Sequence, residues 1–401
     1  MVVKTSLDTT FVLQGSWSLS SLVILTWIMS PNIWFFRRQS GTFKVLVRAS
    51  LNLIKALPFS QPRPQRRKVA LLVGITYSES LPTLGWRLKE PTNDVASVKK
   101  VLIERFGFED KDVIVLSEGD PSSQRPTQEN ISTHLEAFIL PEENVDYFFL
   151  YSGHSSQRKD VAGIEEDGQE EFIIPCDAVH PVKGDILDDK TISDKMLNEK
   201  LVKRLRKGCR LMAIVDSCHS GTLLNLRHQR CNRAGDVKST LRRVARRVVV
   251  EPIFDRLQQR CLAEKIRKSD RSCSGFCPRL PIQIGEKPLA ICISACRDHE
   301  ETFESERCKH RTMTQSIVSL LETSNRRPTL EEIMENAREH ARNVKENMRD
   351  EVDERIKSEC HTFLSRIMNR PYADVKKSCR GSWEPQMSSN HPLNMKAQLR
   401  L

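Results

Sequence analysis

Apolar runs separated by segments of helical periodicity constrain the fold of this chain more than any other feature. The runs are rich in β-branched residues and lack polar alternation, which is typical of strands buried on both faces. They are VALLVGI (69–75), DVIVLSE (112–118), DYFFLYSGH (146–154), RLMAIVD (210–216) and PLAICISAC (288–296). Strands that alternate with helices predict an α/β fold, with a mostly parallel central sheet and helices on both faces.

The intervening segments carry apolar residues at helical spacing and have recognisable helix ends. The predicted helices cover residues 92–108, 127–139, 193–208, 312–322 and 329–357. A threonine or asparagine near the start of the first segment suits an N-cap, and Gly208 suits the end of the third. These helices would cover the two faces of the sheet.

Composition divides the chain into four segments. Residues 1–67 form an N-terminal leader with an apolar segment and a basic linker, and residues 226–287 form a basic insertion. The regular α/β pattern occupies residues 68–225 and 288–401. Residues 9–36 carry no charge and are followed by Arg37 and Arg38, so two interpretations stay open. They form either a leader or a membrane anchor that leaves the rest of the chain in the cytoplasm.

The net charge and the cysteine content restrict the classes of function that this chain can have. The net charge of +11 suits nucleic acid, an anionic membrane surface or a solvated basic linker. No aromatic-rich module interleaves with the basic residues, so no specific nucleic-acid partner is expected. The 12 cysteines follow no recognisable secretion signal, which favours reduced thiols and a cytoplasmic location. Their spacing does not match a zinc ribbon, so a zinc site is not expected.

Two strand ends carry reactive side chains. YSGH ends at His154, and DSCHSG contains Cys218, 218 − 154 = 64 residues further on. Ligands of open α/β sheets bind at the carboxyl ends of strands, so adjacent strands would bring these two residues together. A thiol and an imidazole suffice for acyl transfer, and the N–H groups of Gly153 and Cys218 could stabilise an oxyanion. His219 is the rival base, but its side chain would point away from that of Cys218.

Five motifs occur in an order that is similar to the metacaspase branch of the caspase-like cysteine peptidases. They are YSGHS, EEDGQEEFIIPCD, ILDD, DSCHSG and ISACRD, and the tail PQMSSNHPLNM resembles fungal, type I-like members. The resemblance covers roughly residues 68–395. It implies a caspase-like (caspase-hemoglobinase) fold with a Cys218/His154 dyad. Residues 68–225 would correspond to the large subunit and residues 288–401 to the small one.

The resemblance also implies an acidic pocket for the residue before the cleaved bond. Asp94, Ser152 and Asp216 fall on the matching positions. Two carboxylates favour a cationic guest, so Arg or Lys is the implied P1 residue. Without the resemblance, Asp94 could equally be a helix-start residue. Two departures from the family pattern lie nearby: Ser155, which could crowd the substrate, and Arg311 replace expected glycines.

Calcium activation is the third implied property. The implied ligands are Glu170, Asp188, Asp189 and Asn225, and the first and last stand where aspartate is usual. Asn oxygens also bind Ca²⁺, but one lost charge should weaken the site. Alternatively, Asp188 and Asp189 form a solvated turn.

The sequence therefore predicts a monomeric, calcium-modulated cysteine endopeptidase that cleaves proteins after Arg or Lys and needs no organic cofactor. Arg and Lys residues in the basic insertion offer sites for self-processing. Two alternatives stay open: a catalytically silent caspase-like scaffold that binds partners, and a basic nucleic-acid-binding protein.

Overall fold

The computed structural model describes most of the α/β region and little of the leader and insertion. The described residues are 2–4, 10–12, 66–119, 123–160, 169–218, 220–229, 231–232, 273, 277, 287–296, 311–359 and 384–401. The chain forms two units, residues 1–65 and 66–401. In the first, β1 (Val2–Lys4) pairs antiparallel with β2 (Thr10–Val12).

The membrane prediction for residues 9–36 falls mostly outside the described residues. Of that segment the structure describes only strand residues 10–12. Among the described helices, none has the length and apolarity needed to cross a bilayer. The anchor therefore stays a prediction.

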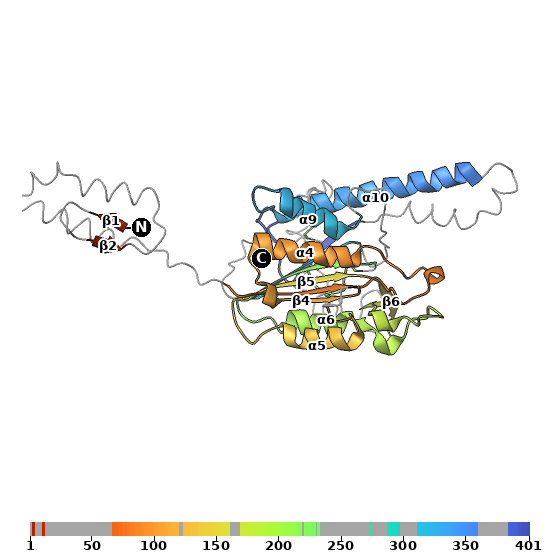
Figure 1. Cartoon of the computed structure of the whole chain (residues 1–401), viewed down its shortest axis with the longest axis horizontal. Coiled ribbons are helices and arrows are strands. Elements are labelled where there is room, and N and C mark those ends of the chain that lie inside the picture. Colours follow the sequence, from red (N-terminus) through yellow and green to blue (C-terminus); the bar gives the residue numbers. More distant parts are fainter. Residues whose placement is uncertain are drawn as a thin grey trace, which may run out of the picture. The chain divides into compact units, whose positions relative to one another are not determined.

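A six-stranded sheet forms the centre of the second unit (Figure 1). Its order is β11-β10-β9-β5-β3-β4, and every neighbouring pair is parallel except the edge pair β10–β11. The strands are β3 (Lys68–Gly74), β4 (Val113–Ser117), β5 (Asp146–Ser152), β9 (Arg210–Asp216), β10 (Leu289–Ser294) and β11 (Gln386–Ser389). The predicted mostly parallel sheet is confirmed.

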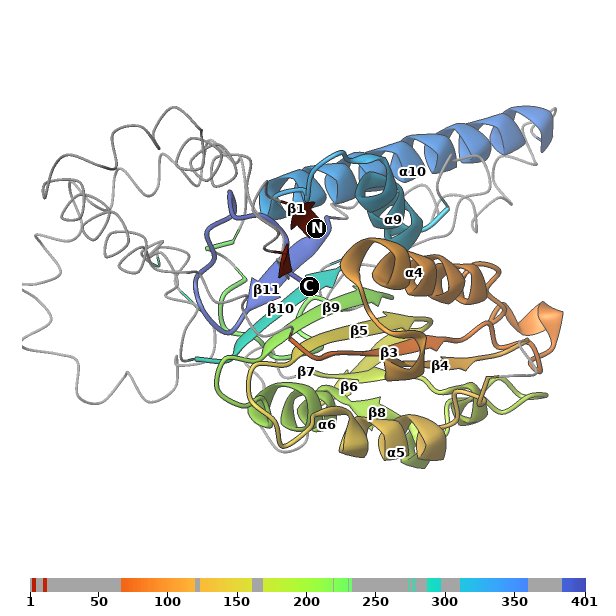
Figure 2. The same ribbon diagram turned by 60° about the vertical axis from the view of Figure 1, so that its left-hand side comes forward.

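Helices cover both faces of this sheet (Figures 1 and 2). One face carries α4 (Pro91–Phe106), α9 (Met313–Thr323) and α10 (Leu330–Glu359). The other carries α5 (Gln128–Phe138) and α6 (Asp194–Leu197), which continues as a π-helical segment, Asn198–Lys203. Along β3, Leu71 and Val73 pack into one hydrophobic core while Ala70 and Leu72 pack into the other. This two-sided burial explains the unbroken apolar runs.

Two features were not predicted because their sequences carry little apolar periodicity. Strands β6 (Ser155–Lys159), β7 (Gln169–Ile173) and β8 (Ile192–Ser193) form a separate antiparallel sheet. β11 has the polar sequence QMSS, yet all four of its residues are buried at the sheet edge. The first small strand starts directly after His154 and so helps to position it.

Close packing between β3 and α4 fixes where α4 begins. A Cβ atom at Gly74 would lie 2.6 Å from the carbonyl oxygen of Pro91, so only glycine allows this approach. Pro91 is the first residue of the helix, where its missing N–H costs nothing. Asp94 therefore lies in the first turn of α4, beside the carboxyl end of β3.

Candidate active site

Two adjacent strands deliver the cysteine and the histidine to one edge of the sheet. β5 and β9 are parallel, and Ser152 is paired with Asp216. His154 and Cys218 each follow two residues later, so both residues lie at the same edge of the sheet, and their direct pairing stays a prediction. Cys218 is half-buried, whereas Cys176, Cys209 and Cys292 are buried. This thiol is thus among the more accessible of those that the structure describes.

The backbone of His154 is held on both sides by buried tyrosines. Its N–H donates to the Tyr77 hydroxyl (2.9 Å), and its carbonyl accepts from the Tyr151 hydroxyl (2.5 Å). Tyr77 itself donates to the Ile174 carbonyl (2.6 Å). These bonds fix the position of the histidine relative to the sheet.

The imidazole ring packs against two aromatic rings. Its centroid lies 4.8 Å from that of Tyr77 and 5.2 Å from that of Trp86, the latter edge-on. Nε2 lies 2.8 Å from the Trp86 carbonyl oxygen. A carbonyl can only accept, so Nε2 must carry the proton and Nδ1 is left to accept one from a thiol. Trp86 therefore sets the tautomer of His154 through its backbone.

Burial also sets the charge state of this histidine. Desolvation lowers the pKa of His154 below its usual value, against the opposing effect of the bond to Trp86. The ring is therefore neutral near pH 7, which a general base requires. His219, the rival base, lies outside the described residues.

Ser155 does not crowd the substrate side of the site as its replacement of glycine led us to expect. Its side chain is buried, and its hydroxyl lies 2.8 Å from the Ser217 hydroxyl. The same hydroxyl donates to the Cys218 carbonyl. Ser155 thus joins the histidine segment to the turn that carries the cysteine.

The oxyanion prediction for Gly153 is not supported. The Gly153 N–H donates to the Asp216 carbonyl (3.3 Å), so this donor is already engaged between the two strands. Glycine is needed there for space, because a Cβ atom would lie 3.0 Å from the Tyr151 hydroxyl. The role of the Cys218 N–H as an oxyanion donor stays a prediction.

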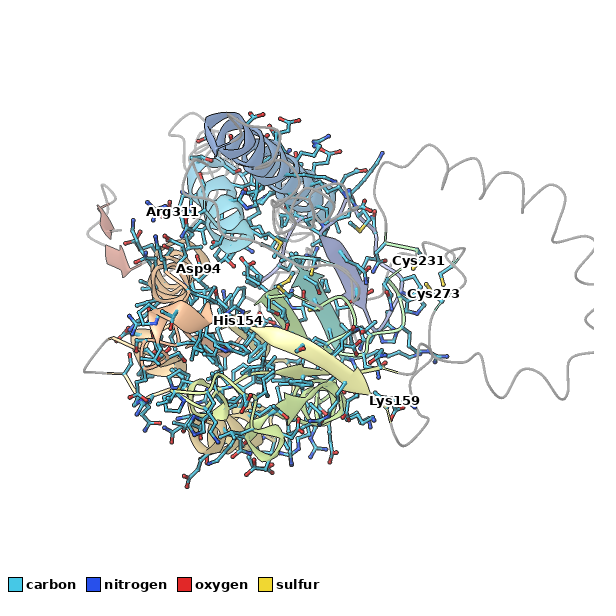
Figure 3. The ribbon with its side chains drawn as sticks, turned by 90° about the vertical axis from the view of Figure 1, so that its right-hand side faces the viewer. Asp94, His154, Lys159, Cys231, Cys273 and Arg311 are labelled. Atoms are coloured by element: carbon cyan, nitrogen blue, oxygen red, sulfur yellow. The ribbon has the colours of Figure 1, made fainter. Side chains whose placement is uncertain are left out.

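Asp94, Ser152 and Asp216, the residues predicted to bind the P1 side chain, lie close together near the carboxyl ends of β5 and β9. Figure 3 labels one of them, Asp94. Asp94 is fully buried and accepts hydrogen bonds from Ser152 (2.7 Å) and from Thr312 (2.7 Å). Asp216 accepts from both the N–H (2.8 Å) and the hydroxyl (2.7 Å) of Thr314. Asp94 is thus more than a helix-start residue.

Asp94 and Asp216 are close enough that the negative charge of one makes ionisation of the other less favourable. Burial, and then the charge of Asp216, raise the pKa of Asp94 well above its usual value. Burial raises the pKa of Asp216 as well. Two neighbouring acids with raised pKa values are unfavourable in their charged forms unless a positive charge joins them. A cation placed beside this pair would therefore favour its ionised form.

Arg311, which stands where the family pattern has glycine, forms an ion pair with Glu90. It precedes α9 and donates to Glu90 (2.6 Å), the residue before α4. Gln315 donates to the other oxygen of the same carboxylate (2.8 Å). The ion pair ties together the starts of the two helices that supply Asp94 and Thr312 (Figure 3).

Two of the four predicted calcium ligands, Glu170 and Asp188, are paired with basic side chains. Arg158 donates to Glu170 (2.7 Å) and lies 3.6 Å from Asp188, while Lys195 donates to the other Glu170 oxygen (3.1 Å). These cations lower the pKa of Glu170 against the opposing effect of burial. Asp189 is exposed. The residues present therefore do not fit a calcium ion as they stand.

Asn225, the fourth predicted ligand, lies in the turn after the cysteine. Its φ is +48°, and its N–H donates to the Thr222 carbonyl. Asn is one of the few residues that adopt this left-handed conformation readily. The residue type at this position is thus explained by local backbone geometry.

Sequence reasoning missed the residues that orient the site. Tyr77 and Trp86 lie in a loop without a motif. Thr312 lies 218 residues beyond Asp94, and Thr314 lies 98 residues beyond Asp216. Glu118 was also missed: its carboxylate accepts from the N–H groups of Thr76 (2.7 Å) and Tyr77 (2.6 Å). It holds the loop that carries Tyr77.

A sheet that brings a neutral histidine and a half-buried cysteine to its carboxyl edge holds the two groups that thiol-dependent acyl transfer requires. Residues 68–227 match the family model for the metacaspase, peptidase C14 domain. This part of the chain is therefore similar to metacaspases, and the mostly parallel sheet is consistent with the caspase-like fold.

The relatives found by sequence are metacaspases from fungi and a plant. Metacaspase-1 of Schizosaccharomyces pombe is 38% identical over 165 residues, which cover 40% of this chain and 36% of the relative. Metacaspase-1 of Cryptococcus neoformans is 38% identical over 162 residues (40% and 34%). Metacaspase-3 of Arabidopsis thaliana is 35% identical over 167 residues (41% and 43%). The chain thus aligns with less than half of the length of these relatives.

Among solved structures, a protein from Geobacter sulfurreducens has a TM-score of 0.39 at 16% identity, over 68% of this chain and 88% of that one. This likeness is too weak to bear on the fold.

Proposed function

We propose that this protein is a cysteine endopeptidase that cleaves after Arg or Lys. The observation that carries the specificity is the pair of neighbouring carboxyl groups of buried Asp94 and half-buried Asp216, beside the strand ends that carry Cys218 and His154. A guanidinium or ammonium group would neutralise this pair through charge-assisted hydrogen bonds. An aspartate at P1 would add a third negative charge.

The reaction follows from the tautomer of His154. Nδ1 takes the proton of Cys218, whose sulfur attacks the scissile carbonyl carbon and forms a C–S bond. The imidazolium then gives its proton to the amine as the C–N bond breaks. Water, activated by the same nitrogen, hydrolyses the thioester and restores the thiol. The Trp86 carbonyl keeps the ring oriented throughout.

Two fluorogenic peptides that differ only at P1 test this function. The purified protein should turn over the Arg peptide and not the Asp peptide, and Cys218→Ala should abolish turnover. Failure on both peptides, together with a Cys218 that does not react with an alkylating probe, would favour the scaffold alternative. Salt-sensitive binding to arbitrary DNA without turnover would favour the nucleic-acid alternative.

Calcium dependence should be weak in this protein. The Arg158 and Lys195 side chains supply the positive charge that Ca²⁺ would bring to Glu170 and Asp188. Turnover of the Arg peptide should therefore be nearly the same with Ca²⁺ and with a chelator. The double variant Arg158→Ala/Lys195→Ala should gain calcium dependence, because its carboxylates are released.

The matched control for calcium is Arg204→Ala, which breaks a surface ion pair with Glu136. It should leave the calcium response unchanged. Strong activation of the unaltered protein by calcium, or tight calcium binding to Cys218→Ala in a titration, would refute this account.

Self-processing is the second regulatory proposal. Residues 233–272 contain 12 Lys and Arg residues among 40, all between the strand of Cys218 and β10. Incubation of active protein should produce fragments with ends in this segment, by mass spectrometry. Cys218→Ala should stay intact under the same conditions, and equal fragmentation of both proteins would reject the proposal.

A further inference from the structure

A second cluster of chemically reactive side chains lies away from the active site. It consists of His228, Cys231, Cys273 and Cys277, and their ligand atoms all lie within 4.8 Å of one another. Figure 3 shows Cys231 and Cys273 side by side, well separated from Asp94 and His154. His228 and Cys231 precede residues 233–272, and Cys273 and Cys277 follow them. The chain therefore returns to the same point after this segment.

The distances suit a tetrahedral metal site. Zinc binds thiolate sulfur at about 2.3 Å and imidazole nitrogen at about 2.0–2.1 Å, so the S···N edge of a tetrahedron is about 3.6 Å. His228 Nδ1 and Cys231 Sγ lie 3.6 Å apart. Three thiols and one imidazole are a ligand set that zinc uses in closed, structural sites.

The ligands stand on backbone that is fixed by the edge of the sheet. The His228 N–H donates to the Ser389 carbonyl on β11 (2.9 Å), and the Cys273 N–H donates to the Arg227 carbonyl (2.8 Å). Asn232, next to Cys231, donates to the Ser389 hydroxyl (2.8 Å). Both pairs of ligands are therefore positioned by hydrogen bonds that involve none of the four side chains.

The cluster is also connected to the turn that carries the catalytic cysteine. Gln386 on β11 donates to the Gly221 carbonyl (3.2 Å) and to the Gln229 side chain (2.7 Å). Gly221 follows Cys218 by three residues, and Gln229 follows His228 directly. A rigid cluster would thus stabilise the backbone after the nucleophile.

The alternative to a metal is a redox pair of cysteines. None of these three cysteines forms a disulfide with another described cysteine. A histidine nitrogen 3.6 Å from one of the sulfurs has no role in a disulfide, whereas a tetrahedral zinc ion needs a fourth donor at such a distance from the others. The presence of His228 therefore favours the metal.

We propose that His228, Cys231, Cys273 and Cys277 bind one Zn²⁺ ion that fastens together the two ends of the basic segment 233–272. The three thiols lose their protons to solvent on binding, and the imidazole binds in its neutral form. This proposal departs from the expectation drawn from cysteine spacing, because the four residues come together only in the fold. If the segment is cut as proposed above, the ion would keep both new ends attached to the sheet edge.

The metal content of the Cys218→Ala protein tests this proposal independently of any peptidase activity. Purified under reducing conditions, it should contain about one Zn²⁺ per chain, as a closed four-ligand site does. Adding Cys273→Ser and Cys277→Ser should reduce this at least tenfold. The control Cys176→Ala, which removes a buried thiol outside the cluster, should keep the ion.

Two further measurements guard against a variant that merely misfolds. Co²⁺ bound in place of zinc should give the absorption of a tetrahedral thiolate site, which Cys277→Ser alone should alter. A zinc chelator should lower the unfolding temperature of Cys218→Ala but not of the variant that also lacks Cys273 and Cys277. Absence of zinc from the reduced protein, or full zinc content in the Cys273→Ser/Cys277→Ser variant, would overturn the proposal.

Discussion

Replacing His154 with glutamine should lower kcat/KM for an Arg-P1 peptide by about 10²–10⁴-fold, the usual contribution of general acid–base catalysis. Glutamine cannot take the thiol proton or return it to the leaving amine. KM should change little, because the side chain contacts Trp86 and Tyr77 rather than the P1 pocket. Steady-state kinetics of the purified variant provide the measurement.

The matched control is His134→Gln on α5, whose imidazole bonds only to the Gln124 side chain among the described contacts. It should retain full activity. Retained activity in His154→Gln, with loss in a His219→Gln variant, would transfer the role of base to His219. A loss caused by misfolding would show as a lowered unfolding temperature.

Replacing Asp94 with asparagine should lower kcat/KM for the Arg peptide by about 10- to 100-fold, because a charge-assisted hydrogen bond contributes about 1.5–3 kcal/mol. The loss should appear mainly in KM. Ser152 and Thr312 donate to different oxygens of Asp94, so in the variant one hydroxyl can still donate to the amide oxygen and the other can accept from the amide nitrogen. The fold should therefore tolerate the change. Asp110→Asn, which alters an exposed carboxylate, should have no effect.

The pH dependence of KM provides an independent check on Asp94. Burial and Asp216 raise the pKa of Asp94, so acidification protonates this pocket earlier than an ordinary carboxyl group. A neutral pocket binds a cation poorly. KM for the Arg peptide should therefore rise as pH falls, and this rise should be smaller in Asp94→Asn. An identical pH profile in the two proteins would contradict the assignment.

Much of the sheet and the reactive pair could be predicted because they depend on local pattern. Buried parallel strands leave unbroken apolar runs, and the chemistry starts where each run stops, at His154 and Cys218. β11 could not be predicted, because its QMSS sequence is buried through pairing with β10 rather than through its own hydrophobicity. Whether such a segment forms a strand is decided by its contacts with distant parts of the chain.

The parts of the site that escaped prediction are made by contacts between distant segments. Trp86 acts through a backbone carbonyl, which no side-chain pattern reveals. Thr312 reaches Asp94 from a helix 218 residues further along the chain. The four proposed zinc ligands lie in two pairs that are separated by residues 232–272. Neither pair alone therefore shows the spacing of a zinc-binding motif. Arg158 and Lys195 were missed because their pairing with Glu170 depends on the small sheet.

A pair of peptides that differ only in arginine or citrulline at P1 tests the central claim most directly. Citrulline keeps the shape of arginine but has no charge, so the comparison isolates the interaction with Asp94 and Asp216. The account predicts a kcat/KM about 10- to 100-fold higher for the arginine peptide, from the strength of charge-assisted hydrogen bonds. Equal turnover of the two peptides, or preference for citrulline, would contradict it.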